Sequence, residues 1–212
     1  HTPVTPDDSG KPTVSPGESD DNKAVSPIEK PKGQTTGDRN VISTLPSVGT
    51  AITDSNTNAS YVVTEPGKTV VYNKVLNKKI KKVIVPSAIY VNGVSYKVTS
   101  VAQNAFSGCK KLKSVTIGNG VTFIGNNAFK KCTSIKKIII PEKVTSIGKN
   151  AFAGCKKLKS IIIKSKTLRK IGKNAFKGIH KNARIKVPKN KLKSYSKLLR
   201  KAKTGKNVKI IK

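Results

Sequence analysis

The stretch VTFIGNNAFKKCTSIKKIIIPEKVTSIGKNAFAGCKKLKSIIIKS, residues 121–165, decides the fold because it contains the same pattern twice. Its triplet Asn-Ala-Phe begins at residues 104, 127, 150 and 174 of the chain, with spacings of 23, 23 and 24 residues. A fixed period in the twenties is typical of a solenoid, in which each repeat is a coil that packs against its neighbours. The sequence therefore predicts a stack of coils.

Apolar residues recur at fixed offsets within this period. Those that follow Cys132 are Ile135, Ile138, Ile140, Val144, Ile147, Ala151 and Phe152, and the positions after Cys109 and Cys155 match them. Their alternation predicts a short strand with alternate residues inward. A second extended segment is expected near 121–124, and each Asn-Ala-Phe is expected to open one helical turn with Asn as its N-cap. The predicted fold class is an α/β solenoid of short parallel strands in coils of ~23 residues.

Gly125, Gly148 and Gly172 each follow the inward Ile of a repeat. Two explanations fit them: a left-handed backbone, which Gly adopts without strain, or a turn packed too closely for a side chain. Ala102 holds the equivalent place in the first coil, which weakens the first explanation.

The repeated pattern V-T-x-I-G-x-N-A-F-x-x-C-x-x-L-x-x-I-x-I-P resembles the BspA-type (Treponema pallidum-like) leucine-rich repeat of bacterial surface proteins, over roughly residues 80–190. The resemblance implies a right-handed superhelix and adhesion to host matrix proteins, mucosal surfaces or other bacteria. The chain departs from the pattern at Ile179, where Cys is expected, and at Gly118 and Lys164, where Pro is expected. These departures concern the ends of the array.

The ends of the array are expected to be capped, because a solenoid leaves its terminal coils uncovered. Upstream, Pro66-Gly67 suits a type II turn between two strands, and Asn92-Gly93 suits a type I′ hairpin. Downstream, apolar residues at helical spacing predict a capping helix between Pro188 and Gly205, followed by a strand at 207–212. The predicted segments are a disordered Pro/Ser/Thr/Asp-rich linker at 1–45, a β-hairpin cap with the first strand at 46–98, the repeats at 99–188 and a C-terminal cap at 189–212.

The chain of 212 residues has a formal net charge of +33, which is unevenly distributed. Residues 1–40 carry seven acids and five bases, so the remainder carries 38 bases against three acids. A region with this charge attracts polyanions. The alternative is a soluble repeat protein in which Lys simply occupies the exposed positions. Only four bases are Arg, so anion binding should be diffuse rather than base-specific. No segment has the ~20 apolar residues of a membrane span, and the absence of Met indicates a processed or truncated chain.

The three cysteines, Cys109, Cys132 and Cys155, permit three interpretations: a metal site, a redox site or a packing position. Zinc needs four converging ligands, whereas these cysteines would lie one per coil with parallel Cα–Cβ bonds. Parallel Cα–Cβ bonds also suit a disulfide poorly. Ile179 takes the same slot in the next coil, which indicates a buried apolar position where Cys packs as a small hydrophobe.

Catalytic groups are scarce in the region predicted to fold. Its only carboxylates are Asp54, Glu65 and Glu142, at unrelated repeat positions, and its only histidine, His180, is predicted to be a surface loop residue. The sequence contains no phosphate-binding loop, nucleophile elbow or metal-ligand set. We therefore expect a protein that is not an enzyme and has no cofactor or metal.

The candidate partner-binding surface combines outward strand residues with lysines stacked beside them. Its residues are Lys113, Lys136, Lys137, Ile139, Lys159, Ile162, Lys164 and Lys186. Solenoids commonly bind partners on such surfaces, and Ile139 and Ile162 are predicted to be exposed there. Stacked lysines repel one another by under about 1 kcal/mol per pair, so they fit either an anionic partner or side chains that splay into water.

These observations predict an extracellular or bacterial cell-surface binding module, a monomer, that presents a Lys-rich surface to an extracellular protein or an acidic glycan. The alternative is electrostatic retention on wall polymers such as teichoic acid, with no specific partner. Nucleic acid is disfavoured as a partner, because the exposed aromatics and Arg that stack on bases are lacking.

Overall fold

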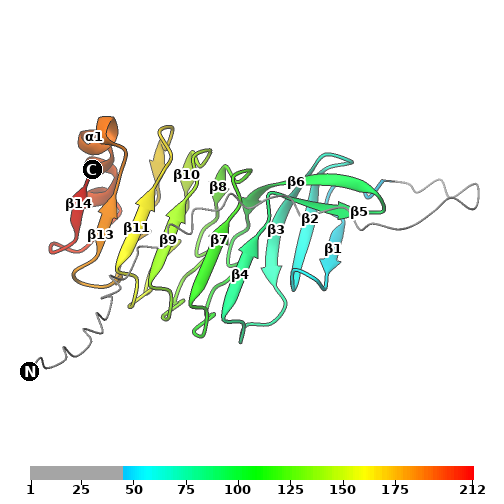
Figure 1. The fold of residues 1–212 in the computed structure, drawn as a ribbon, viewed down its shortest axis with the longest axis horizontal. Helices are drawn as coiled ribbons and strands as arrows, with labels where there is room; N and C mark the ends of the chain where they lie inside the picture. The colour runs from blue at the N-terminus through cyan, green and yellow to red at the C-terminus, as the bar shows by residue number, and fades with distance from the viewer. Residues whose placement is uncertain (1–44) are drawn as a thin grey trace, which may run out of the picture.

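The computed structural model describes residues 45–212, which form a β-solenoid with a helix at its C-terminal end (Figure 1). The predicted disordered linker at 1–45 lies outside the described residues except for Leu45. The N-terminal strands are β1 (Ala51–Asp54), β2 (Ala59–Glu65), β3 (Thr69–Val75), β4 (Lys82–Val85), β5 (Ala88–Val91) and β6 (Val94–Val101). The later elements are β7 (Ser114–Ile117), β8 (Phe123–Ile124), β9 (Lys137–Ile140), β10 (Ser146–Ile147), β11 (Ser160–Ile163), β12 (Lys170–Ile171), β13 (Arg184–Lys186), the 3-10 helix η1 (Lys189–Lys191), α1 (Leu192–Lys201) and β14 (Lys209–Ile211).

The coils stack by parallel pairing of equivalent strands. In one wall, β8, β10 and β12 continue a sheet that runs through β6 and β3 to β2 and β1, with β5 beside β6. In the other wall, β9, β11, β13 and β14 form one sheet and β4 pairs with β7 (Figure 1). Hydrogen bonds from Thr122 Oγ1 to Thr99 O and from Thr145 Oγ1 to Thr122 O join residues 23 positions apart. Each coil therefore rests on the one before it.

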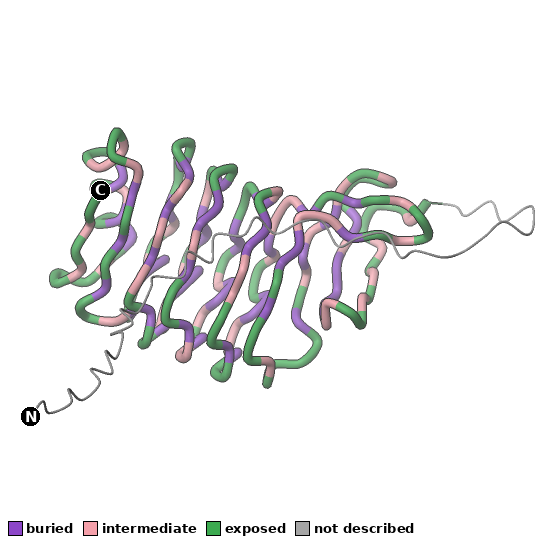
Figure 2. The backbone as a smooth tube through the Cα atoms, viewed as in Figure 1, coloured by how far each residue is buried: buried purple, intermediate pink, exposed green. Residues whose placement is uncertain are grey.

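A file of aromatic rings, one per coil, runs through the core. Phe106, Phe129, Phe152 and Phe176 are fully buried, and successive ring centroids lie 4.9, 5.2 and 5.3 Å apart. This spacing is close to the distance of about 4.8 Å between adjacent strands, because each ring belongs to one coil. Buried residues follow the inner side of the coils along the length of the solenoid (Figure 2).

The Asn-Ala-Phe segments form hydrogen-bonded turns, so the prediction of a helical turn with an Asn N-cap is wrong. Asn127 and Asn150 have φ values of 55° and 56°, whereas an N-cap residue has an extended backbone. The Ala128 N–H donates to Gly125 O at 3.3 Å, which places Asn127 third in a four-residue turn. At that position a positive φ favours Gly or Asn. The backbone conformation therefore explains the repeated Asn.

Close packing between coils explains the repeated Gly. Gly125, Gly148 and Gly172 do not have a positive φ. A Cβ on Gly148 would lie 2.5 Å from the backbone nitrogen of Asn126 in the preceding coil, where no side-chain atom fits. Ala102 donates the equivalent hydrogen bond to Tyr72 O of β3, where the preceding chain belongs to the N-terminal hairpin rather than to a repeat with the Asn-Ala-Phe pattern.

All three cysteines are free thiols that are fully buried in the core. Cys132 Sγ donates to Phe106 O at 3.0 Å, and Cys155 Sγ donates to Phe129 O at 3.1 Å. Burial raises the pKa of Cys155 to about 12. This geometry supports the packing interpretation and adds a weak hydrogen bond to the preceding coil.

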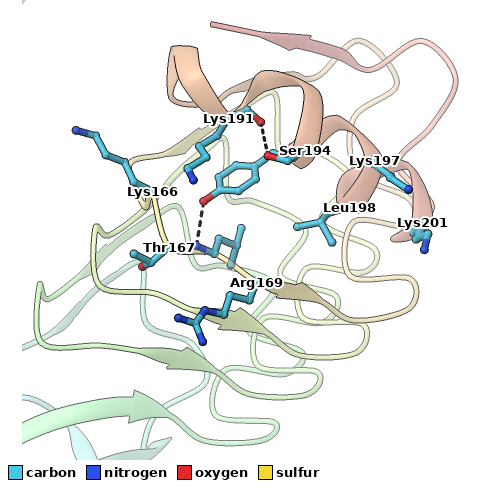
Figure 3. Close-up of a pocket in the computed structure, with 10 residues that line it drawn as sticks. Lys166, Thr167, Arg169, Lys191, Ser194, Lys197, Leu198 and Lys201 are labelled. Carbon is cyan, nitrogen blue, oxygen red and sulfur yellow. Dashed lines mark hydrogen bonds between the residues drawn. The ribbon is translucent and has the colours of Figure 1, made fainter.

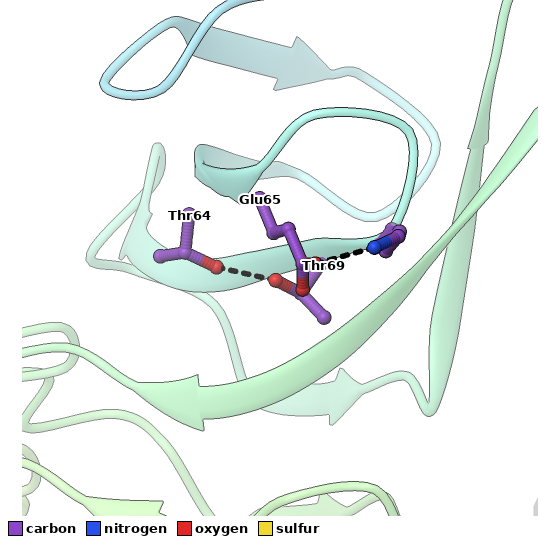
Figure 4. A network of polar contacts seen from close by, with 4 residues as sticks. Thr64, Glu65 and Thr69 are labelled. Atoms are coloured by element: carbon purple, nitrogen blue, oxygen red, sulfur yellow. Dashed lines mark hydrogen bonds and ion pairs between the residues drawn. The ribbon is translucent and has the colours of Figure 1, made fainter.

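Antiparallel hairpins lie at the N-terminal end of the molecule, and β1 pairs with β2 in the first of them. β2 and β3 pair antiparallel around Pro66-Gly67, where Gly67 has a φ of 67°. The hydroxyls of Thr64 and Thr69 share a hydrogen bond of 2.8 Å across this turn (Figure 4). β5 and β6 pair antiparallel around Asn92-Gly93, in which both residues have the positive φ that a type I′ turn requires.

The predicted C-terminal helix is present as α1. Its apolar side packs inward, since Tyr195 and Leu199 are buried. The predicted final strand is present as β14, which pairs in parallel with β13.

Candidate binding surface

The outward residues of β4, β7, β9, β11 and β13, with the residues that flank these strands, make up the outer sheet face. Ile139 pairs with Ile162, and Ile162 pairs with Lys186, so these three form one row across the sheet. Lys137 pairs with Ser160 in the row beside it. Ile139 and Ile162 are half-buried rather than exposed as predicted. Ile162 lies between Ile139 and Lys186, whereas Ile139 has a paired neighbour only on the side of β11.

The remaining candidate lysines lie at the ends of these strands or on them. Lys113, Lys136 and Lys159 each precede a strand and are exposed. The Lys159 N–H donates to Lys136 O at 2.9 Å, so these two side chains start from adjacent backbones. Lys164 follows β11 and is half-buried, and Lys186 is exposed. The structure therefore places all eight candidate residues on the outer sheet face.

A groove interrupts this face between β7 and β9. Among the described strands, ladders join β4 to β7 and β9 to β11, but none joins β7 to β9. Val115 points toward the core, yet it is only half-buried because the gap exposes it. The groove has a volume of about 450 Å³ and is lined by Lys82, Lys113, Ser114, Val115, Thr116, Lys136, Lys137 and Ile139. Like-charge repulsion among its four lysines opposes closure of the gap.

Sequence reasoning missed the groove and one end of the apolar row. Ile84 pairs with Thr116 and is 42% exposed, so it begins the row that continues at Ile139. Its outward position could have been found, because Val83 and Val85 on either side follow the inward pattern. The groove had no such signal, since β7 and β9 carry the same repeat pattern as paired strands.

Three lysines that precede strands on the outer sheet face lack an ion-pair partner among the described residues. The single ion pair within residues 45–212 joins Lys68 to Glu65 at 2.7 Å, in the N-terminal hairpin. Lys113, Lys136 and Lys159 have no carboxylate partner in that part of the chain. An anionic group that approaches them therefore displaces no ion pair formed within residues 45–212.

The other singled-out groups have local roles or lie elsewhere. His180 Nδ1 accepts a hydrogen bond from the Asn182 N–H at 3.2 Å, within one loop. In the described part of the chain, no three His, Cys, Asp or Glu side chains lie close enough together to hold a metal ion. The expectation that exposed aromatics are lacking is wrong at Tyr90 and Phe123, which are 40% and 39% exposed. Both belong to the sheet opposite the outer sheet face.

The repeats of the chain match a known family of repeat proteins. The model of the BspA type leucine rich repeat region matches residues 77–204 in six copies. No helix among the described residues has the length and apolar character needed to cross a membrane. The comparison with curated proteins finds no match.

Several solved structures are similar to the chain. A leucine-rich repeat protein from Bacteroides ovatus is 27% identical with a TM-score of 0.49, and the match covers 79% of this chain and 36% of that one. One from Bacteroides capillosus is 19% identical with a TM-score of 0.55 and coverages of 76% and 97%. A leucine rich cell surface protein from Faecalibacterium prausnitzii is 19% identical with a TM-score of 0.51 and coverages of 76% and 50%. The chain thus spans about a third of the Bacteroides ovatus protein.

Proposed function

The chain belongs to the BspA-type leucine-rich repeat family, whose model matches more than half of its length, and from this premise we propose that it is a non-enzymatic binding and adhesion module. Its partner is an extracellular protein or an acidic glycan, and binding requires no cofactor. Repeat proteins of this kind bind through extended surfaces that their stacked coils create. We assign this role to the outer sheet face.

The observation that carries the proposal is an apolar row beside cationic rows on one preformed face. Ile139 and Ile162 pair directly, with Lys137 one row away. Protein interfaces combine an apolar centre with a polar rim. Pairing of β9, β11 and β13 already orders this part of the face, so little conformational entropy is lost when a partner binds.

A bacterial surface or extracellular location is part of the proposal. The Faecalibacterium prausnitzii protein is described as a cell surface protein, and we extend that location to this chain. We expect the module to act as a monomer, because the proposed partner occupies a face that needs no second copy of the chain.

Retention on wall polymers is a second candidate, which the charge of the chain favours. The formal net charge is +33, and Lys113, Lys136 and Lys159 have no carboxylate partner within the described residues. A linear polyanion such as teichoic acid can bind such a surface by charge alone. DNA would be held in the same diffuse way, and we do not expect it to be the physiological partner.

Salt separates the two candidates. We would measure retention of the chain on matrix proteins, teichoic acid, heparin and DNA at about 0.05 M and about 0.5 M salt, where the screening length falls severalfold. Adhesion predicts that binding to at least one matrix protein persists at high salt. Retention on teichoic acid alone, abolished by salt, would remove the adhesion proposal.

A double variant tests the outer sheet face directly. Ile139→Thr with Ile162→Thr removes the apolar row while keeping β-branched side chains, and Thr116 already occupies this row. We expect a loss of about tenfold or more in affinity for the matrix protein, since truncated interface anchors commonly cost over about 1 kcal/mol each. Phe123→Thr, on the opposite sheet, is the matched control. An equal loss in the control would place the binding surface elsewhere.

A further inference from the structure

A second hollow lies between α1 and the loop before β12, apart from the outer sheet face. It has a volume of about 570 Å³ and opens between residues 166–169 and one side of α1 (Figure 3). Leu168, Tyr195 and Leu198 supply apolar lining, and Thr167 and Ser194 bring hydroxyl groups to it. A hollow of this size suits a small ligand or a fragment of a polymer.

Buried hydrogen bonds fix the loop and the helix relative to one another. This repeat is one residue longer than the two before it, and Ser165 in its longer connection is fully buried. Ser165 Oγ donates to Val144 O at 2.6 Å, and Ser165 O accepts from the Tyr195 hydroxyl at 3.1 Å. That hydroxyl also accepts from the Leu168 N–H at 2.9 Å. Because Tyr195 belongs to α1, the hollow is formed before any ligand binds.

Five cations border the hollow and no acid does. They are Lys166, Arg169, Lys191, Lys197 and Lys201. Figure 3 shows the first three on one side of the hollow and the last two on the other. Within residues 45–212, none of these five side chains takes part in an ion pair. The first turn of α1 also lacks an acid and a side-chain cap, so the partial positive charge of its N-terminus adds to the field.

We infer that this hollow binds a sulfated sugar unit of an acidic glycan. Lys and Arg hold sulfate oxygens through charge-assisted hydrogen bonds. The Ser194 hydroxyl donates to Lys191 O, so its oxygen is left to accept a hydrogen bond from a sugar hydroxyl, and Thr167 offers a second hydroxyl oxygen. Leu198 offers an apolar contact for the C–H face of the ring. The inference rests on the proposed function, because it takes the chain to be an extracellular binding module. It assigns the acidic partner to a site separate from the outer sheet face.

The arrangement of the cations favours a ring over a linear polyanion. The cations lie on two sides of the hollow, and the anionic substituents of a sugar ring likewise project from different sides of the ring. A glycerol phosphate chain has no apolar ring face, and a file of lysines such as Lys113, Lys136 and Lys159 matches it better. The hollow is therefore assigned to the glycan.

The test is titration of the full chain with a heparin-derived tetrasaccharide at about 0.15 M salt, followed by amide chemical shifts and calorimetry. The shifts should concentrate in residues 166–169 and 191–201, and a desulfated tetrasaccharide should not bind. The triple variant Lys166→Gln, Arg169→Gln, Lys191→Gln should lower the affinity about tenfold or more, because it removes three charged hydrogen-bond donors.

The matched control is Lys79→Gln, Lys111→Gln, Lys157→Gln, which removes the same charge from exposed positions outside both surfaces. It should change the affinity by less than about threefold, as expected for screened distant charges. Thermal unfolding verifies that each variant is folded. If the triple variant does not fold, the double variant Lys197→Gln, Lys201→Gln takes its place in the same titration.

Three outcomes would overturn the inference. Equal losses in variant and control, or shifts spread over the outer sheet face, would mean that net charge alone drives binding. Tighter binding of a glycerol phosphate oligomer than of the tetrasaccharide at the hollow would rule out the sugar assignment. Binding of a matrix protein to the outer sheet face is measured separately, so the failure of either proposal is seen without the other.

Discussion

At the scale of single residues, each repeated letter has its own physical cause. Asn127 holds a positive φ, Gly148 permits backbone contact, and Phe129 stacks in the file of rings. Cys132 fills a buried slot and its thiol donates to Phe106 O in the preceding coil. The motif therefore encodes stacking between coils, and any specificity lies in the residues between its copies.

The slot of Cys132 gives a stability prediction. Cys132→Ala should lower the free energy of unfolding by about 1–3 kcal/mol, because it leaves a cavity in a packed core. Cys132→Val should cost less, since Ile179 fills the equivalent slot with an apolar side chain. Denaturant unfolding monitored by circular dichroism measures both. Equal stability of Cys132→Ala and the unchanged chain would show that the slot is not packed.

The thiol of Cys155 gives a pH prediction. Burial raises its pKa from 9.0 to about 12, so the folded state holds the proton more tightly than the unfolded state. Its contribution to stability is complete below about pH 9 and is lost as pH rises toward about 12. Relative to Cys155→Val, the chain should lose on the order of 1 kcal/mol of unfolding free energy between pH 7 and pH 10. A pH-independent difference between the two would contradict this assignment.

The sequence predicted the positions of these residues better than their roles. Ile179 in the Cys slot identified a buried apolar site, and the thiols are buried. Asn was expected to be an N-cap, but it has a positive φ. The prediction failed because an N-cap and the third position of a turn both favour Asn. Local propensity alone does not distinguish a helix start from a turn.

At the scale of elements, turn residues and apolar periodicity predicted the hairpins and the helix, but they did not predict where a sheet is interrupted. Pro66-Gly67, Asn92-Gly93 and the apolar spacing in α1 placed two hairpins and a helix correctly. The gap between β7 and β9 and the hollow beside α1 depend on how neighbouring coils meet. Such features arise from packing between coils, and the residue pattern within one repeat carries no information about it.

Contact between coils makes a second stability prediction. Gly148→Ala should lower the free energy of unfolding by about 1–3 kcal/mol or more, because its Cβ would lie 2.5 Å from the Asn126 backbone nitrogen. Gly205→Ala is the matched control, since its Cβ would meet only a Val208 side-chain carbon at 3.8 Å. It should stay within about 0.5 kcal/mol of the unchanged chain. Similar losses in both variants would indicate a general effect of replacing Gly.

At the scale of the whole molecule, the fold tolerates a large excess of positive charge. The formal net charge is +33, and residues 45–212 contain one ion pair. Stability therefore comes from the file of rings and the inward aliphatic rows, while the surface charge opposes compaction. Screening by salt should relieve that opposition without changing the core.

This balance predicts that sodium chloride stabilises the chain. Raising it from about 0.02 M to about 0.5 M should increase the free energy of unfolding by on the order of 1 kcal/mol. The variant Lys113→Gln, Lys136→Gln, Lys159→Gln should be more stable than the unchanged chain at low salt, because stacked like charges repel. The control Lys79→Gln, Lys143→Gln, Lys157→Gln loses the same charge from exposed positions that are not equivalent places in adjacent coils. It should gain less, and the two variants should converge at high salt. An equal gain in both at low salt would show that net charge, rather than the stacking of these lysines, sets the effect.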